Sequence, residues 1–166
     1  MKLGDGVETA IHCVAVLAGL TDGAVMPTAA LAEHYDVSPS YLAKHLKALV
    51  AGHVLVSVPG PAGGYQLAKP PAEISLLDVV LAIEGRDPAF RCKDIRRNGP
   101  CVPDDSAFPK PCGIKRAMLK AEQTYRAELA AVSIQDLVTD FQETSDTRVI
   151  ARGENFIAEN ERPKKL

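Results

Sequence analysis

The sequence predicts a mainly α-helical protein with a small β wing: a winged helix-turn-helix followed by a long dimerisation helix. Two observations support this fold class. Three helical segments precede a short hairpin within residues 1–85, and a long amphipathic segment at 113–131 follows a proline-rich loop. The chain has 166 residues, of which 46% are hydrophobic and 24% charged, which is ordinary for a globular protein.

The first three helices are predicted at 7–20, 28–35 and 39–51. The first is apolar almost all round, so we expect it to be buried. The third has a clear beginning, because Ser38 is a good N-cap and Pro39 suits the first helical position. Gly52 is a suitable residue to end it.

A hairpin and a fourth helix complete the first domain, predicted at 1–85. Strands are expected at 54–58 and 65–67, joined by a tight turn rich in proline and glycine. Ser75 and Asp78 have the spacing of a capping box, and Gly85 is expected to close the helix that they begin.

Residues 86–112 are predicted to form a cluster-binding loop, because five prolines rule out long regular structure and three cysteines suggest a function. The helix at 113–131 carries an apolar stripe that suits pairing with a partner helix, although packing on its own domain is also open. Ser133 with Asp136 should cap a short helix to about Glu143. These two helices form a segment at 113–143, and a mobile tail is expected at 144–166.

The cysteine pattern favours a metal or redox role over disulfides. We find no signal peptide and no membrane span, so we expect a cytoplasmic protein whose thiols stay reduced. Cys13 is predicted to be a small buried residue. Cys92, Cys101 and Cys112 are too widely spaced for a zinc ribbon, but such a loop can wrap an iron–sulfur cluster. Three thiolates leave at least one ligand position to another residue.

Glu8 and His12 are candidates for the remaining ligand positions. They lie four residues apart and therefore share one face of the first helix. Alternatively, the two side chains form a hydrogen bond within the helix, or the helix face that carries them is simply exposed.

A DNA-reading surface is predicted on the third helix and the wing. In a helix-turn-helix the second helix of the motif enters the major groove, and its first residues contact base edges or phosphates. The predicted contacts are Ser38, Ser40, Tyr41, Lys44, His45 and Lys47 on this helix and Gly60, Gly63, Gly64 and Tyr65 on the wing. The alternative is a surface helix with scattered lysines and an ordinary hairpin.

The segments 38–42, 59–65 and 74–80, together with the three-cysteine loop, resemble the IscR/NsrR family of regulators. The resemblance implies a homodimer that binds a partly palindromic DNA duplex and holds an iron–sulfur cluster. The pair Glu8 and His12 makes the chain most similar to RsrR-type redox sensors. That similarity implies a [2Fe-2S] cluster held by Cys101 and Cys112 with Glu8 and His12 of the partner subunit, and leaves Cys92 spare. A set of Cys92, Cys101, Cys112 and Glu8 would suit a [4Fe-4S] cluster, as in an NsrR-like nitric-oxide sensor.

The sequence therefore predicts a transcription regulator, expected to be a repressor, that senses redox state through its cluster. A cluster-free regulator that responds through thiols or zinc is one alternative, and an electron-transfer protein on a DNA-binding fold is another. We expect no enzyme activity, because the chain has no evident nucleophile–base pair or phosphate loop. No small-molecule substrate and no membrane partner are expected either.

Overall fold

A computed structural model describes residues 3–163, and it has the predicted order of helices and strands as far as residue 144. The head of the molecule, residues 3–85, contains the first helices and the wing. The helices are α1 (Asp5–Leu17), α2 (Thr28–His34), α3 (Pro39–Ala51), α4 (Leu76–Glu84), α5 (Gly113–Ala131), α6 (Ile134–Thr144) and α7 (Thr147–Asn160), and the strands are β1 (Leu55–Val58) and β2 (Gly64–Leu67). The first helix is three residues shorter at its end than the sequence predicts.

Local capping fixes where several helices begin. The Ser38 hydroxyl accepts a hydrogen bond from the Tyr41 N–H at 3.2 Å, and Pro39 occupies the first turn of α3. Ser75 and Asp78 form the predicted capping box of α4, with both reciprocal hydrogen bonds in place. A second capping box begins α6. These caps satisfy amide groups that have no partner inside the helix.

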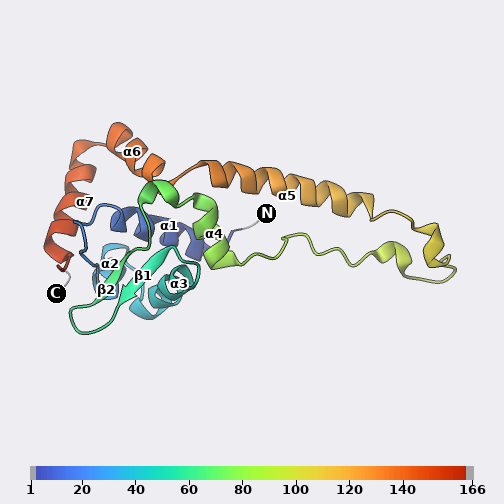
Figure 1. The fold of residues 1–166 in the computed structure, drawn as a ribbon, viewed down its shortest axis with the longest axis horizontal. Coiled ribbons are helices and arrows are strands. Elements are labelled where there is room, and N and C mark those ends of the chain that lie inside the picture. Colours follow the sequence, from blue (N-terminus) through green and yellow to red (C-terminus); the bar gives the residue numbers. More distant parts are fainter. Residues whose placement is uncertain (1–2, 164–166) are drawn as a thin grey trace.

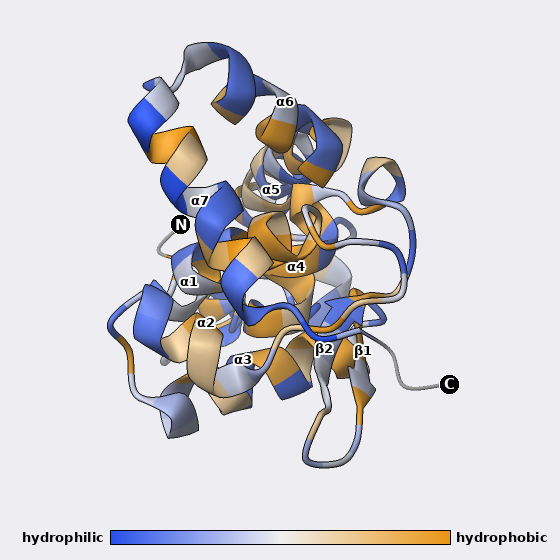
Figure 2. Cartoon of the chain, turned by 90° about the vertical axis from the view of Figure 1, so that its left-hand side faces the viewer, coloured by the Kyte–Doolittle hydropathy of each residue, from blue (hydrophilic) through white to orange (hydrophobic). Residues whose placement is uncertain are grey.

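The core of the head lies where α1, α3 and α4 meet β1, and Figure 2 colours much of the ribbon there as hydrophobic. Leu42, Leu46 and Leu49 form the inner face of α3, and each is fully buried. Burial of one such side chain stabilises the fold by about 1.5–3 kcal/mol. Cys13 is buried as predicted, and its burial raises the pKa of the thiol to about 12.

The wing is a two-stranded antiparallel sheet in which Leu55 pairs with Leu67 and Val58 with Gly64. The segment before α2 extends it, because Met26 and Tyr65 exchange two backbone hydrogen bonds of 2.9 Å. Gly64 permits this close approach: a Cβ atom there would lie 2.4 Å from the Met26 carbonyl oxygen. The wing is thus bonded to the helical head along one edge.

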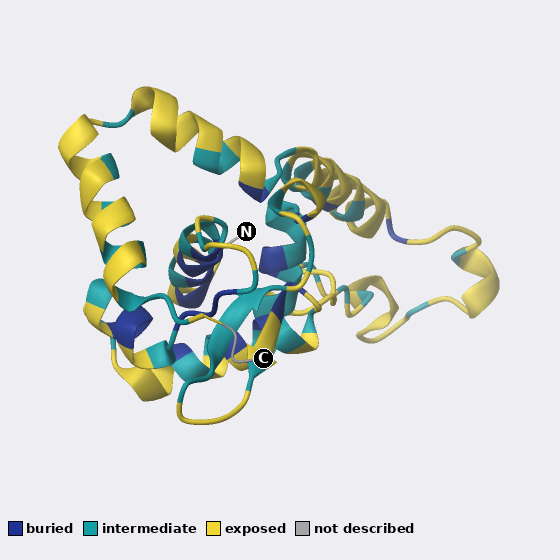
Figure 3. Ribbon diagram, turned by 60° about the vertical axis from the view of Figure 1, so that its left-hand side comes forward, coloured by how far each residue is buried: buried dark blue, intermediate teal, exposed yellow. Residues whose placement is uncertain are grey.

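Residues 86–131, the arm, extend away from the head (Figure 1). The arm consists of the loop at 86–112 and α5, and most of its residues are exposed (Figure 3). At the other end of α5 the chain returns to the head, where the Leu76 N–H donates to the Val132 carbonyl at 2.9 Å and the Ile134 N–H donates to the Ile74 carbonyl at 2.8 Å. The loop contains only short 3-10 turns among stretches without regular structure.

The segment predicted as a mobile tail, 144–166, instead contains α7 in its described part. Asp146 caps this helix by accepting a hydrogen bond from the Arg148 N–H at 2.8 Å. The Phe156 ring stacks on His34 of α2 with ring centroids 4.0 Å apart. Residues 164–166 lie outside the described residues. Within residues 3–163, no helix has both the length and the apolar composition needed to cross a membrane.

Candidate metal centre and nucleic-acid interface

Two loop cysteines lie close together with a carboxylate beside them. The Sγ atoms of Cys92 and Cys112 and one Asp94 oxygen all lie within 4.8 Å of one another. Cys101 is exposed elsewhere in the loop, with a left-handed φ of 63°. The resemblance to RsrR-type sensors implies a pair of Cys101 with Cys112, whereas the structure brings Cys92 close to Cys112. Asp94 was not among the predicted site residues. It lies two residues after Cys92, and this short spacing in the sequence could have indicated that it belongs to the site.

Cys112 has the surroundings of a thiolate. It is 8% exposed and occupies the N-cap position of α5. Backbone N–H groups of the first helical turn, that of Lys115 foremost, lower its pKa below the usual range, and the nearby Arg96 guanidinium acts in the same direction. Thiolates are the form in which cysteines bind iron and zinc. The donor set present here therefore fits a metal or an iron–sulfur cluster.

Asp94 also organises the loop through two arginines. Arg96 donates to it from Nε at 2.7 Å and from Nη2 at 3.2 Å, and Arg97 donates from Nε at 3.1 Å. The hydrogen bond from Arg96 is the main reason that the pKa of Asp94 is lowered. Both guanidinium groups lie over the Phe108 ring, at 5.3 and 4.8 Å from its centroid. Arg96 thus brings positive charge close to both thiols.

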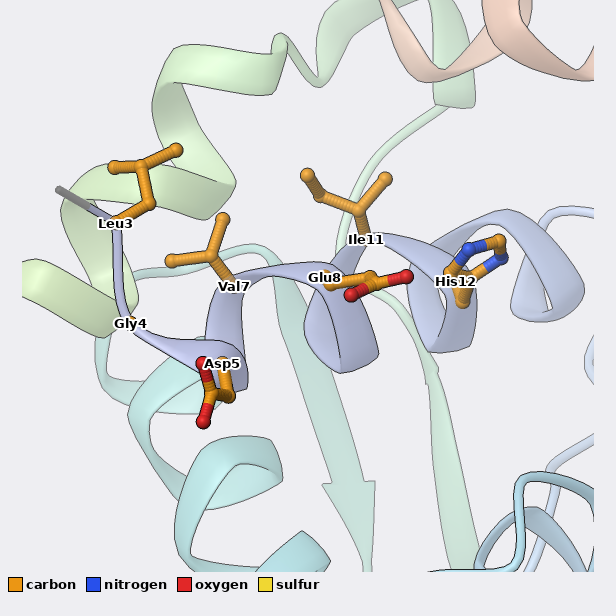
Figure 4. Close-up of a pocket in the computed structure, with 7 residues that line it drawn as sticks. All are labelled: Leu3, Gly4, Asp5, Val7, Glu8, Ile11 and His12. Carbon is orange, nitrogen blue, oxygen red and sulfur yellow. The ribbon is translucent and has the colours of Figure 1, made fainter.

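Glu8 and His12 project from the same side of α1, beside a shallow pocket of about 370 Å³ (Figure 4). Both side chains are exposed. Within residues 3–163 no hydrogen bond or ion pair joins them, so they are free to bind a third group. Leu3, Val7 and Ile11 contribute apolar side chains to the lining of the pocket, which also includes Gly4 and Asp5.

The two halves of the predicted ligand set lie in different parts of one chain. Glu8 and His12 belong to the head, whereas Cys112 lies at the outer end of α5 (Figure 1). A helix of 19 residues is about 28 Å long, at 1.5 Å per residue. The group of close ligands in the described chain contains neither Glu8 nor His12. One chain alone does not assemble the predicted set.

The predicted reading surface is exposed at the beginning of α3. Ser38, Ser40, Tyr41, Lys44 and Lys47 are all exposed, and Ser38 also caps the helix. The two lysines lie three residues apart and so share one side of the helix. This end of α3 offers hydroxyls, an aromatic ring and positive charge to a ligand.

His45 differs from its neighbours because its ring turns toward α1. A Cβ atom on Gly6 would lie 2.3 Å from the His45 Cε1, so the ring fills the space that the glycine leaves. Its Nε2 is buried and has no hydrogen-bond partner among residues 3–163. Burial, and then the charge of Lys44, lowers the pKa of His45. The His45 ring connects the first turn of α1 to α3, the predicted DNA-reading helix. It also packs edge-on against the Tyr41 ring, with ring centroids 4.6 Å apart.

The wing glycines serve mainly the fold. Gly60 has a φ of 105°, which other residues rarely adopt, and Gly63 has no room for a side chain because a Cβ atom would lie 2.0 Å from the Val58 carbonyl oxygen. The backbone N–H groups of Gly63 and Tyr65 donate to the carbonyls of Gly60 and Met26, so neither is available to a phosphate.

The family model described as an iron-dependent transcriptional regulator, Rrf2, matches residues 3–140. The chain belongs to the Rrf2 family. This confirms the resemblance inferred from the sequence. Among curated relatives, an HTH-type transcriptional regulator named YffB from Lactococcus lactis is 37% identical over 142 residues, covering 86% of this chain and 90% of its own. YwgB from Bacillus subtilis, named in the same way, is 38% identical over 95 residues, covering 57% of this chain and 61% of its own.

Two solved structures have a similar fold. IscR from T. potens has a TM-score of 0.64 at 19% identity and covers 88% of this chain and 92% of its own. CymR, the global cysteine regulator of B. subtilis, has a TM-score of 0.63 at 16% identity, and the match covers 84% of this chain and 97% of the CymR chain. The winged helix-turn-helix architecture is therefore confirmed, and the chain is a transcriptional regulator by family.

Proposed function

We propose that this Rrf2 protein is a homodimeric DNA-binding regulator that senses redox state through an iron–sulfur cluster held between two subunits. The observation that carries the proposal is the separation of the ligands. Cys92 and Cys112 lie at the end of an arm, and Glu8 and His12 face outward from the head. A second copy of the chain is the simplest source of the missing half of the set.

The apolar stripe of α5 supports the dimer. Ile114 is 66% exposed and Met118 is 44% exposed, while Tyr125 and Leu129 are half-buried beside α4. Large exposed apolar groups in a helical row are typical of a surface that pairs with another helix. Pairing would bring the arm of one subunit toward the head of the other.

In this arrangement Cys112, with Cys92 or Cys101, would hold a [2Fe-2S] cluster together with Glu8 and His12 of the partner subunit. When bound, such a cluster gains or loses one electron at a potential tuned by its ligands. Ligation would hold the first turns of α1, and Gly6 there contacts His45 of the reading helix. A change in ligation would therefore shift α3 through this contact and alter the fit to two DNA half-sites.

The first experiment measures cluster content and DNA affinity together. Protein purified without oxygen should absorb in the visible range and contain iron and sulfide. The oxidised, reduced and apo forms should then differ by at least about 1 kcal/mol in binding to a selected duplex, the lower end of usual coupling energies. Equal affinities at matched salt would mean that the cluster has no sensory role.

A mixed dimer tests whether ligation crosses the interface. One chain carries Glu8→Ala with His12→Ala, and the other carries Cys112→Ala. With ligands from both subunits, one of the two sites keeps its full set, so about half of the wild-type cluster should remain. With ligands from a single chain, both sites are broken and the mixed dimer should be colourless. A homodimer of the Glu8/His12 variant that stays fully coloured would remove these residues from the site.

A zinc-bound regulator is a second candidate, favoured by the Asp94 carboxylate beside two thiols. Zinc accepts such mixed sulfur and oxygen ligands within one chain. The two candidates differ in colour and in metal content. A colourless protein with stoichiometric zinc, lost in Asp94→Ala, would replace the cluster proposal.

A further inference from the structure

Residues 145–163, the C-terminal strap, pack across the head. Ile157 of α7 lies beside Gly19, where a Cβ atom would be 2.8 Å from its Cδ1. The Glu161 carboxylate accepts hydrogen bonds from the Thr21 N–H at 2.9 Å and from its hydroxyl at 3.1 Å. The strap is therefore attached to the segment between α1 and α2, and its end has a defined position.

The strap ends against the wing. Arg162 and Val25 exchange two backbone hydrogen bonds of 2.9 Å, and the next residue, Met26, pairs in the same way with Tyr65 of β2. The Arg162 Nη1 donates to the Pro61 carbonyl in the wing turn at 2.8 Å. Within residues 3–163 this is the only hydrogen bond of the guanidinium, which has no ion-pair partner there.

The wing has no positive charge of its own. Residues 54–68 contain neither lysine nor arginine, and Arg162 comes from a segment almost a hundred residues further along the chain. Arginine binds phosphate through a planar group with five N–H donors, of which one is occupied here. The guanidinium thus gives the wing turn the kind of group that contacts a DNA backbone.

We propose that Arg162 is a phosphate-contacting residue of the DNA interface, carried onto the wing by the C-terminal strap. The proposal rests on the DNA binding proposed above and adds a residue that the family match does not cover, since that match ends at residue 140. Each subunit of a dimer would contribute one such contact. Lys164 and Lys165 follow in the sequence, outside the described residues.

The test is a salt titration of binding to a random-sequence duplex, because phosphate contacts do not depend on sequence. Each lost phosphate contact should make the slope of log K against log salt shallower by about 0.9, so a dimeric variant that loses both should be shallower by about 1.8 and bind about 60-fold more weakly near 0.1 M salt. Arg162→Gln should show this effect, and Arg162→Lys should keep the wild-type slope. Arg148→Gln, an equal charge change on a side chain that is 88% exposed in the first turn of α7, should change neither quantity.

The outcomes separate this proposal from the proposed function. If Lys44→Ala reduces the slope and Arg162→Gln does not, Arg162 makes no phosphate contact although the protein binds DNA. If both Arg162 variants weaken binding equally at an unchanged slope, the residue only holds the wing in place, and the proposal is overturned. If the wild-type protein does not bind DNA, the proposed function fails first. Thermal unfolding of each variant checks that the head remains folded.

Discussion

Glu122 attaches the cysteine loop to α5 through hydrogen bonds, and we expect its removal to lower the free energy of unfolding. The residue is 8% exposed, and its carboxylate accepts hydrogen bonds from the Ala89 N–H at 3.1 Å and from Arg126 Nε and Nη2 at 3.0 and 2.7 Å. Arg126 Nη2 also donates to the carbonyls of Arg86 and Asp87, at 3.2 Å each. The beginning of the loop is thus attached to the helix at one point.

Glu122→Ala leaves a backbone N–H without an acceptor and a guanidinium without its counter-charge. Removing one partner of a buried ion pair costs about 3–5 kcal/mol. The Arg126 side chain is 30% exposed, so water replaces part of that interaction and we expect a loss of about 2–3 kcal/mol. Glu122→Gln retains an acceptor for Ala89 and should lose about 1–2 kcal/mol.

Urea unfolding at fixed protein concentration measures this loss. With a slope near 2 kcal/mol per molar urea, the midpoint should fall by about 1–1.5 M for the alanine variant. Glu128→Ala, on the same helix but exposed, is the matched control and should stay within about 0.5 kcal/mol of the wild type. An equally small change for both variants would refute the role given to Glu122.

Three further predictions concern the head. Gly60→Ala should destabilise the protein by about 1–2 kcal/mol because φ is 105° there, and an unchanged melting temperature would contradict this. Burial raises the pKa of Asp78, but hydrogen bonds from Ser75 and the charge of Lys69 outweigh it and lower the pKa. Its contribution to the free energy of unfolding is therefore complete above about pH 4 and lost as pH falls through the lowered pKa, and Asp78→Asn should lack this dependence. Lys44→Ala should weaken DNA binding and make its salt slope shallower by about 1 per subunit, about 2 for the dimer, whereas full binding at an unchanged slope would exclude a phosphate contact.

Features set by neighbouring residues were predictable from the sequence. Ser38 with Pro39 and Ser75 with Asp78 begin their helices as expected, because a cap involves only residues within one turn. The bounds of α5 agree with the prediction for the same reason, since proline-rich loop sequence precedes it and its apolar stripe runs to its end.

Features that depend on distant contacts were not predictable. The proximity of Cys92 and Cys112 results from the folding of the whole loop, and spacing alone does not distinguish it from a pair with Cys101. The inward position of His45 depends on a glycine about forty residues earlier. The polar composition of the tail concealed α7, although Phe156 and Ile157 were a sign that one side of it packs against the head.

The exposed arm also affects how fast proteases would degrade a chain that has no partner subunit. Its loop has little regular structure, and almost all of its residues are accessible, so a protease would reach it before any part of the head. A chain whose arm is covered by a partner would be protected, while one without a partner would be cleaved. Degradation of unassembled chains would then keep the amount of regulator close to the amount that has paired.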